Sequence, residues 1–319
     1  MKQKLRSDGE KMLKVKRNLL GINELTSEEI EHILDTTRSF KEVSKRSIKK
    51  VPTLRGRTIA NFFLEPSTRT RTSFELAAKR LSADVINISA ETSAVAKGES
   101  LKDTAKTIQA LGADLVVIRH SAAGAPYFLT KIINCPVVNA GDGAHEHPTQ
   151  ALVDLYTIRE RMGKIAGLKV AIVGDVAHSR VARSNILGLT KMGAEVTLVG
   201  PPTLIPLNIE SLGASVDYSF ESVLRDVDVV YLLRLQLERQ NGLQFPSLRE
   251  YTNLYGVDMR RLKLMKDKVM IMHPGPMNRG IEISSEVADL SQVAVTEQVT
   301  NGIAVRMAVL YLLIGGGEI

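Results

Sequence analysis

Short apolar runs rich in valine and isoleucine alternate with amphipathic stretches along most of the chain. The runs with the length of strands lie at 58–64, 85–88, 114–119, 136–139, 169–173, 195–199, 228–233, 269–272 and 293–295. Helical patterns occur at 28–41, 68–81, 100–111, 148–162, 179–192, 220–225 and 302–314. Within 68–81 the apolar positions 74, 77, 78 and 81 share one helix face, which predicts that this face packs on a core.

The strand-like runs predict the fold class. Residues 115–118 and 170–173 are apolar throughout, as in parallel strands buried on both faces. Their alternation with helices favours an α/β protein with two doubly wound parallel-sheet domains joined by bridging helices, and 319 residues suffice for two domains. We predict a division near residue 150, bridged by helix 148–162. The expected units are a basic N-terminal tail (1–17), a first domain (18–149, to which the C-terminal helix 302–319 returns) and a second domain (150–301).

Charge and composition exclude several classes of partner. The net charge is +7, but residues 1–17 hold seven Lys/Arg against Asp8 and Glu10, which leaves only +2 elsewhere. A basic chain invites a nucleic-acid interpretation, yet the excess lies in this tail, so we expect no nucleic acid partner. No apolar stretch reaches the roughly 18–20 residues of a membrane span, and the N-terminus lacks an apolar signal-peptide core. The single cysteine, Cys135, fits a cytoplasmic location and is expected to be a core residue of a buried strand.

The segment Ser67-Thr68-Arg69-Thr70-Arg71 lies where the apolar run 58–64 gives way to a helix. The first turn of a helix has unpaired N–H groups and favours anions, so arginines there cost about 0.3–1 kcal/mol each unless an anion neutralises them. The hydroxyls between them add further donors. The segment therefore predicts a phosphate-binding site.

Arginines and other polar residues also follow several of the other predicted strands. In open parallel sheets, ligands lie beyond the carboxyl ends of the strands. Arginines occur early in the loops after three more runs, at Arg119, Arg180 and Arg234. The remaining loops are 141–150 and 273–280. Together they predict an anion-binding cleft with more positive charge than one phosphate needs, which suits a phosphate plus one or two carboxylates.

Several of these residues also allow a structural interpretation. His145 and His147 flank Glu146 and suggest metal ligands, but there is no second His/Cys cluster, so we expect no metal. Pro148 suits the first position of a helix, which places His147 near its N-cap and Gln150 in its first turn. Arg71 is expected to be a supporting residue rather than a ligand. Arg234 ends an apolar run, so pairing with a structural carboxylate is an alternative to a binding role. His120 and His178 are expected to be structural.

No nucleophile–base set, P-loop or paired-carboxylate arrangement stands out, so chemistry by positioning and charge stabilisation, without a cofactor, fits the chain better. The chain resembles the catalytic chains of the aspartate carbamoyltransferase family from about Leu19 to Leu313. The motifs that carry this resemblance are Phe63–Arg71, Lys97-Gly98-Glu99, Val117–His120, Asn139–Gly143, His147–Gln150, Gly174-Asp175 with His178–Arg180, Leu233–Gln236 and His273–Pro276.

The resemblance implies transfer of the carbamoyl group of carbamoyl phosphate to L-aspartate, on the route to pyrimidines. It assigns the phosphate to Ser67, Thr68, Arg69 and Thr70, and the carbonyl oxygen to Thr70, Arg119 and His147. It assigns the carbamoyl nitrogen to Gln150 and the Gly275-Pro276 backbone, and the two carboxylates of aspartate to Arg180, Arg234 and Gln236. Ser93 and Lys97 match residues delivered by a neighbouring subunit, with Lys97 also on aspartate, which implies a homotrimer with shared sites. A regulatory or dihydroorotase-like partner chain stays open.

Three alternatives compete with this interpretation. Ornithine carbamoyltransferases resemble the phosphate-binding half, but they carry a His-Cys-Leu-Pro loop where this chain has His273-Pro-Gly-Pro276, and they offer an acidic residue to a cationic acceptor. A nucleotide-dependent dehydrogenase would need the G-x-G-x-x-G fingerprint, which the loop at Gly174 lacks. A non-catalytic scaffold would not need every catalytic position filled.

Overall fold

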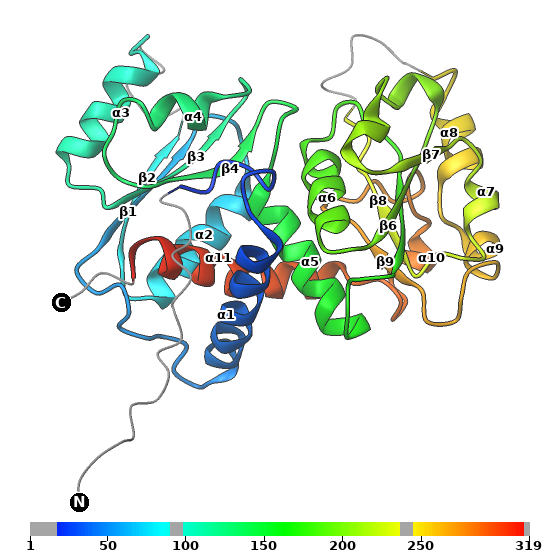
Figure 1. The fold of residues 1–319 in the computed structure, drawn as a ribbon, viewed down its shortest axis with the longest axis horizontal. Coiled ribbons are helices and arrows are strands. Elements are labelled where there is room, and N and C mark those ends of the chain that lie inside the picture. Colours follow the sequence, from blue (N-terminus) through cyan, green and yellow to red (C-terminus); the bar gives the residue numbers. More distant parts are fainter. Residues whose placement is uncertain (1–17, 90–97, 237–244, 316–319) are drawn as a thin grey trace, which may run out of the picture.

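The computed structural model describes residues 18–89, 98–236 and 245–315, which form two lobes side by side, each built on a parallel sheet (Figure 1). The first sheet has the order β2-β1-β3-β4 and the second the order β7-β6-β5-β8-β9. The strands are β1 (Thr58–Phe63), β2 (Asp84–Ser89), β3 (Leu115–His120), β4 (Val137–Asp142), β5 (Lys169–Val173), β6 (Glu195–Val199), β7 (Ser215–Asp217), β8 (Val229–Leu232) and β9 (Met270–Met272). Every pairing between them is parallel, so the predicted pair of doubly wound sheets is confirmed.

Helices surround both sheets and connect the lobes (Figure 1). They are α1 (Ser27–Lys45), α2 (Thr68–Arg80), α3 (Leu101–Ala110), α4 (Ala125–Leu129), α5 (Pro148–Met162), α6 (Arg180–Lys191), α7 (Phe220–Val223), α8 (Leu248–Tyr255), α9 (Met259–Leu262), α10 (Ser285–Ala288) and α11 (Val295–Ile314), with 3-10 turns η2 (Pro202–Leu204) and η3 (Ile209–Leu212). Helix α5 packs against β4 in the first lobe and α6 in the second, and α11 returns to pack against α1, α2 and α5. These are the expected bridging helices.

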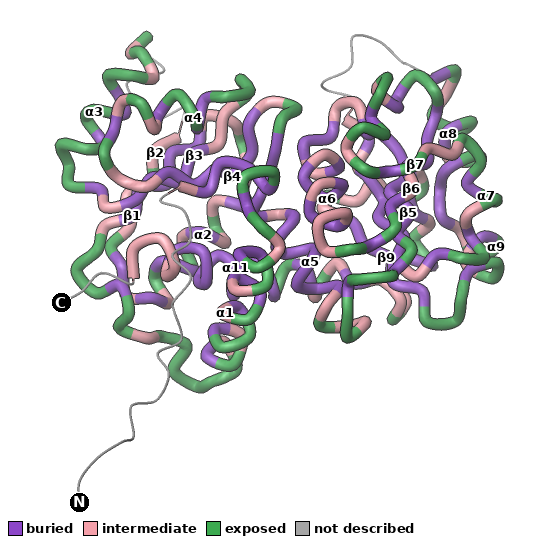
Figure 2. Tube along the Cα trace, in the orientation of Figure 1, coloured by how far each residue is buried: buried purple, intermediate pink, exposed green. Residues whose placement is uncertain are grey.

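The two lobes share one apolar core. Phe63 of the first sheet, Leu152 of α5 and Ile172 of the second sheet belong to the same cluster of buried side chains. Figure 2 shows this burial following the strands and α5 from one lobe into the other. Because burial of apolar surface stabilises by about 25 cal/mol per Å², a continuous core opposes separation of the lobes. The carboxyl ends of both sheets are thereby held toward a common space.

Three expectations about the fold are wrong. The run 293–295 is not a strand: Val293 makes a single bridge to Ile271, and α11 begins at Val295, seven residues before the expected start. Polar residues in the first turns of α11 masked this start, because they interrupt the apolar pattern. Cys135 packs against the core of the first lobe as expected, but it lies in a bend before β4 rather than in a buried strand and is only half-buried, since the strand begins at Val137. Within the described segments, no helix combines the length and apolar character that crossing a bilayer requires.

Candidate active site

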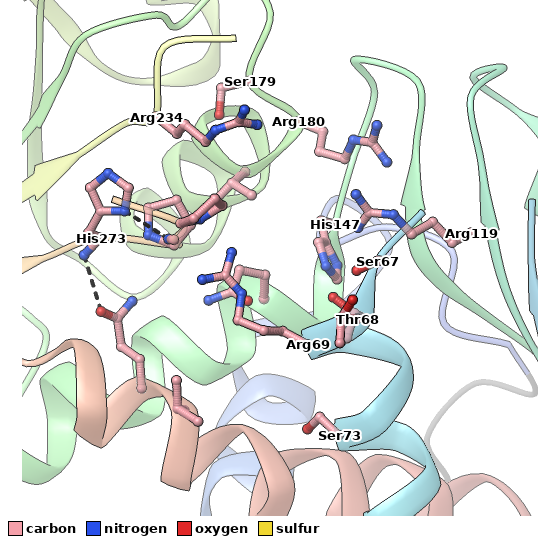
Figure 3. Close-up of a pocket in the computed structure, with 18 of the residues that line it drawn as sticks. Ser67, Thr68, Arg69, Ser73, Arg119, His147, Ser179, Arg180, Arg234 and His273 are labelled. Atoms are coloured by element: carbon pink, nitrogen blue, oxygen red, sulfur yellow. Dashed lines mark hydrogen bonds between the residues drawn. The ribbon is translucent and has the colours of Figure 1, made fainter. Parts of the chain in front are cut away.

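A cavity of about 570 Å³ lies between the lobes, at the carboxyl ends of the strands (Figure 3). Its volume is within the usual range for small-molecule sites. Its polar lining comes from both lobes and from α5 and α11, and it comprises Glu65, Ser67, Thr68, Arg69, Thr70, Ser73, Arg119, His147, Gln150, Ser179, Arg180, Arg234, Gln236, His273, Gln298 and Arg306. Five arginines on one cavity make it an anion site.

The start of α2 forms the part of this cavity that suits a phosphate group. Ser67 is the N-cap residue, and its hydroxyl makes no capping hydrogen bond, while no acidic side chain lies in the first turn. Burial lowers the pKa of Arg69, and the nearby charge of Arg234 lowers it further, but the guanidinium remains charged at neutral pH. A side chain at Gly275, where φ is +64°, would collide with this guanidinium, so a glycine is required where the second lobe meets α2.

Glu65 joins the two lobes at the cavity wall. One carboxylate oxygen accepts from Nη2 of Arg119 and the other from Nη2 of Arg180, each at 2.7 Å. Arg119 belongs to β3 and Arg180 begins α6, so the bridge spans both lobes. A side chain at Gly141 would lie 2.8 Å from Nη1 of Arg180, and its φ of +115° also requires glycine. Glu65 lies in the motif Phe63–Arg71, but the sequence alone indicates no role for it.

Arg180 retains hydrogen-bonding capacity inside the cavity wall. Its side chain is nearly fully buried, and Nε and Nη1 find no acceptor among the described residues. Burial lowers the pKa of Arg180, and the charge of Arg119 adds to this. A buried donor without a partner carries a cost of about 1–3 kcal/mol, so these atoms favour an incoming acceptor such as a carboxylate.

His147 faces the same cavity as a neutral imidazole. Burial lowers its pKa well below the usual value, and the charges of Arg119, Arg306 and Arg180 act in the same direction. Its backbone N–H donates to the hydroxyl of Ser184 at 2.9 Å. The Thr149 hydroxyl lies 3.5 Å from Nδ1, and donation there favours the tautomer with the proton on Nε2. Such a ring can donate one hydrogen bond to a substrate oxygen.

Arg234 and Gln236 reach the cavity from the loop after β8, and the backbone of this loop is tied down by buried carboxylates. The N–H of Gln236 donates to Asp175 at 3.3 Å, and the N–H of Leu235 donates to Glu282 at 3.0 Å. The loop after β9 is similarly fixed, because Nδ1 of His273 accepts from the N–H of Gly275 at 2.8 Å. Both loops are therefore held at the wall that faces α2.

The structure brings most predicted site residues together on one cavity. The residues that line it as predicted are Ser67, Thr68, Arg69, Thr70, Arg119, His147, Gln150, Arg180, Arg234, Gln236, Gly275 and Pro276. Ser93 and Lys97 lie outside the described residues. Arg71, expected to be supporting rather than ligating, does not line the cavity. Residues that sequence reasoning missed include Glu65, Ser73, Ser179, His273, Gln298 and Arg306.

The histidines of the remaining motifs make local contacts. His145 pairs with Asp142 at 3.1 Å and does not line the cavity with His147. His178 contacts Asp175 at 2.8 Å, and Nδ1 of His120 accepts from the N–H of Ala122. Among the residues that the structure describes, no group of three or more His, Cys, Asp or Glu side chains has the arrangement of a metal site.

Comparison with known families agrees with the fold and the cavity. Residues 17–160 match the carbamoyl-phosphate-binding domain of the aspartate/ornithine carbamoyltransferases, and residues 166–313 match the aspartate/ornithine-binding domain. Fold and site thus define a carbamoyltransferase.

Individual relatives narrow this class. The chain is 61% identical over 303 residues to the aspartate carbamoyltransferase catalytic subunit of Moorella thermoacetica, covering 95% of this chain and 99% of the relative. It is 60% identical over 300 residues to that of Halothermothrix orenii, covering 94% and 96%. The chain belongs to the aspartate carbamoyltransferase family.

Solved structures show the same fold. The catalytic subunit of M. jannaschii aspartate transcarbamoylase matches with a TM-score of 0.82 and 39% identity, over 94% of this chain and 98% of that chain. Aspartate transcarbamoylase from Trypanosoma cruzi in complex with carbamoyl phosphate and aspartate matches with a TM-score of 0.85 and 29% identity, over 93% and 95%.

Proposed function

We propose that this chain transfers the carbamoyl group of carbamoyl phosphate to the amino group of L-aspartate, giving N-carbamoyl-L-aspartate and phosphate, as a step of de novo pyrimidine biosynthesis. One observation carries the proposal: the α2 anion site of the first lobe and Arg180 and Arg234 of the second lobe line a single cavity. Two anionic substrates would meet there. The relatives named aspartate carbamoyltransferase support the same conclusion.

Carbamoyl phosphate would bind at the start of α2. In this proposal Ser67, Thr68, Arg69 and Thr70 hold the phosphate, with the helix N-terminus supplying backbone donors. Thr70 also turns to the carbonyl oxygen together with Arg119 and neutral His147. This oxygen gains negative charge in the tetrahedral transition state, and each well-placed donor there is worth about 2.7–4 kcal/mol.

The remaining polar groups would orient the transferred group and the acceptor. Gln150 and the Gly275-Pro276 backbone face the carbamoyl nitrogen, and backbone carbonyls accept from its N–H groups. On the opposite side, Arg180, Arg234 and Gln236 bind the two carboxylates of aspartate. The unpartnered Nε and Nη1 of Arg180 support this role, and they would repel the cationic side chain of ornithine.

The chemistry needs no covalent enzyme intermediate. The lone pair of the aspartate amine forms the new C–N bond at the carbamoyl carbon, and the C–O bond to phosphate breaks with the electron pair leaving on phosphate. The amine proton passes to that departing phosphate. The protein contributes position and charge stabilisation, which together can supply most of the rate enhancement.

Phosphate release with different acceptors tests this function. With carbamoyl phosphate present, we expect L-aspartate to drive phosphate release and L-ornithine to give only the background hydrolysis rate. In Arg234→Ala the KM for aspartate should rise about 10- to 100-fold, the effect of losing a charged hydrogen bond. Arg225→Ala, an exposed arginine of the same lobe, serves as the matched control.

Two outcomes would contradict these assignments. Release driven equally by ornithine would overturn the acceptor assignment. An aspartate KM in Arg234→Ala that stays equal to that of Arg225→Ala would remove Arg234 from the carboxylate site.

We further propose a homotrimer with shared active sites, in the cytoplasm. Ser93 and Lys97 follow β2, the edge strand on the side of the first sheet away from β4, the strand next to the second lobe. As an edge strand, β2 leaves this side of the first sheet open to a neighbouring subunit. Exposed Tyr127 and Phe128 on α4 supply apolar surface for such contacts. The proposed units of the chain are a basic tail (1–17), a carbamoyl phosphate-binding domain (18–149 with helix 302–319) and an aspartate-binding domain (150–301).

Mixing inactive variants tests the shared site. Lys97→Ala and Arg69→Ala chains should each be nearly inactive alone, but mixed trimers should regain activity because some sites combine an intact Arg69 with an intact Lys97. Each variant dissociated and reassembled with itself is the control. Mixed trimers, verified by native mass, that show no gain over these controls would rule out sharing.

A further inference from the structure

Asp154 is a fully buried carboxylate to which the proposed reaction gives no role. It lies on α5 one turn after Gln150, so the two side chains share a helix face. Its Oδ1 accepts from Nε2 of Gln150 at 2.9 Å and from Nε2 of Gln298 at 2.8 Å. Its Oδ2 accepts from Nδ2 of Asn185 at 3.0 Å and from the hydroxyl of Tyr231 at 2.7 Å. Each oxygen thus has two donors, which fills the acceptor capacity of a carboxylate.

The donors arrive from four elements that surround the cavity. Asn185 belongs to α6, Tyr231 to β8 and Gln298 to α11. Gln298 also lines the cavity, and its Oε1 accepts from the N–H of His273 at 3.1 Å. Asp154 therefore lies behind the cavity wall and accepts hydrogen bonds from two residues that line it, Gln150 and Gln298.

The ionisation state of Asp154 determines what its partners can do. Burial raises the pKa of Asp154 to about 6, while the four hydrogen bonds oppose this rise, so the group is ionised at neutral pH. Burial also raises the pKa of Tyr231 well above its usual value, which keeps its hydroxyl as a donor. An ionised carboxylate only accepts. Gln150 must therefore direct its NH₂ group to Asp154, and its Oε1 is the atom left for a ligand.

We propose that Asp154 is a positioning residue that fixes the amide orientation of Gln150, so that the cavity selects a carbamoyl group over an acyl group of the same shape. Oε1 accepts from the NH₂ of carbamoyl phosphate, whereas the methyl group of acetyl phosphate offers no donor. A site built to hydrogen-bond a substrate N–H discriminates strongly against an analogue that lacks it. The inference rests on the proposed function, in which Gln150 faces the carbamoyl nitrogen.

The test compares kcat/KM for carbamoyl phosphate with that for acetyl phosphate, with aspartate as the acceptor. The native enzyme should prefer carbamoyl phosphate at least about tenfold. In Asp154→Asn an amide NH₂ enters a site of four donors, so the amide of Gln150 turns and the preference should fall at least about tenfold. Tyr231→Phe removes a donor from the other carboxylate oxygen and should leave the preference unchanged. This control distinguishes a change in the orientation of Gln150 from a general loss of stability.

The outcomes are distinguishable. If native enzyme releases no phosphate with aspartate and carbamoyl phosphate, the proposed function itself fails. If the native enzyme is active but its kcat/KM values for carbamoyl phosphate and acetyl phosphate are nearly equal, the positioning role is overturned. This outcome does not depend on whether Asp154→Asn folds. A folded Asp154→Asn or Asp154→Ser whose rates fall equally with both acyl phosphates also overturns it, because a purely structural role would act on both alike. In the double variant Asp154→Asn/Gln150→Glu, an acceptor again faces the ligand, and the preference should recover.

Discussion

Replacing Arg69 with alanine is expected to lower kcat for carbamoylation of aspartate at least about 10²-fold, the scale of losing one transition-state donor. Its guanidinium lines the cavity from the first turn of α2, against Gly275. The departing phosphate gains charge there as the C–O bond breaks, and Arg69 neutralises it. Steady-state phosphate release at saturating aspartate measures the effect.

Arg71→Ala is the matched control for this variant. Arg71 follows two residues later on the same helix, but it does not line the cavity. Its substitution should leave kcat close to that of the unmodified enzyme. Equal losses in both variants would mean that the charge of the helix as a whole, rather than the position of Arg69, supports the reaction.

Arg119→Ala is the second variant with a large expected effect, again at least about 10²-fold in kcat, because a donor to the developing oxyanion is lost. This substitution also removes Arg119 from Glu65, which bridges the two arginines, while the ion pair between Glu65 and Arg180 stays. Glu65 would then compete more strongly with aspartate for Arg180, so the aspartate KM should rise together with the loss in kcat. Rates over a range of both substrates separate the two effects.

Arg57→Ala is the control for this variant. Arg57 precedes β1 at the opposite end of the same sheet, where it pairs with Asp114 at 2.9 Å. Loss of one arginine there should alter neither kcat nor the aspartate KM. A turnover of Arg119→Ala that matches the Arg57 control would remove Arg119 from the oxyanion site.

The regular elements were predictable where local signals agree. Helix α5 has the predicted bounds, because Pro148 suits its first turn and Gly163 adopts a left-handed conformation directly after it. The sequence did not predict strand β7 (Ser215–Asp217), because it is a short edge strand with a largely polar sequence. Its residues are not buried, so they form no apolar run. Helices α4 and α8 were not among the predicted elements, since each is short and its position is set by tertiary packing.

The candidate site was predictable to the extent that its residues follow strands. Arg119 and Arg234 were found in this way, because parallel strands end at one edge of a sheet. Glu65 and Arg306 contact partners distant in sequence, as Arg306 contacts Ser73 at 3.0 Å, and three of the four donors to Asp154 are also distant. No local pattern in the sequence marks such buried polar contacts. Topology identified the cavity, whereas the network behind its walls required the three-dimensional structure.

The carboxylate of Glu65 also gives the cavity an internal counter-ion. A tethered group acts at an effective concentration of the order of millimolar or higher, so a dilute monovalent anion such as chloride competes poorly for the guanidinium groups it holds. Arg69, Arg234 and Arg306 also line the cavity, so a ligand with several anionic groups gains contacts that chloride cannot make. The bridge between the lobes is therefore also a filter that favours polyanionic guests over the salt of the surrounding solution.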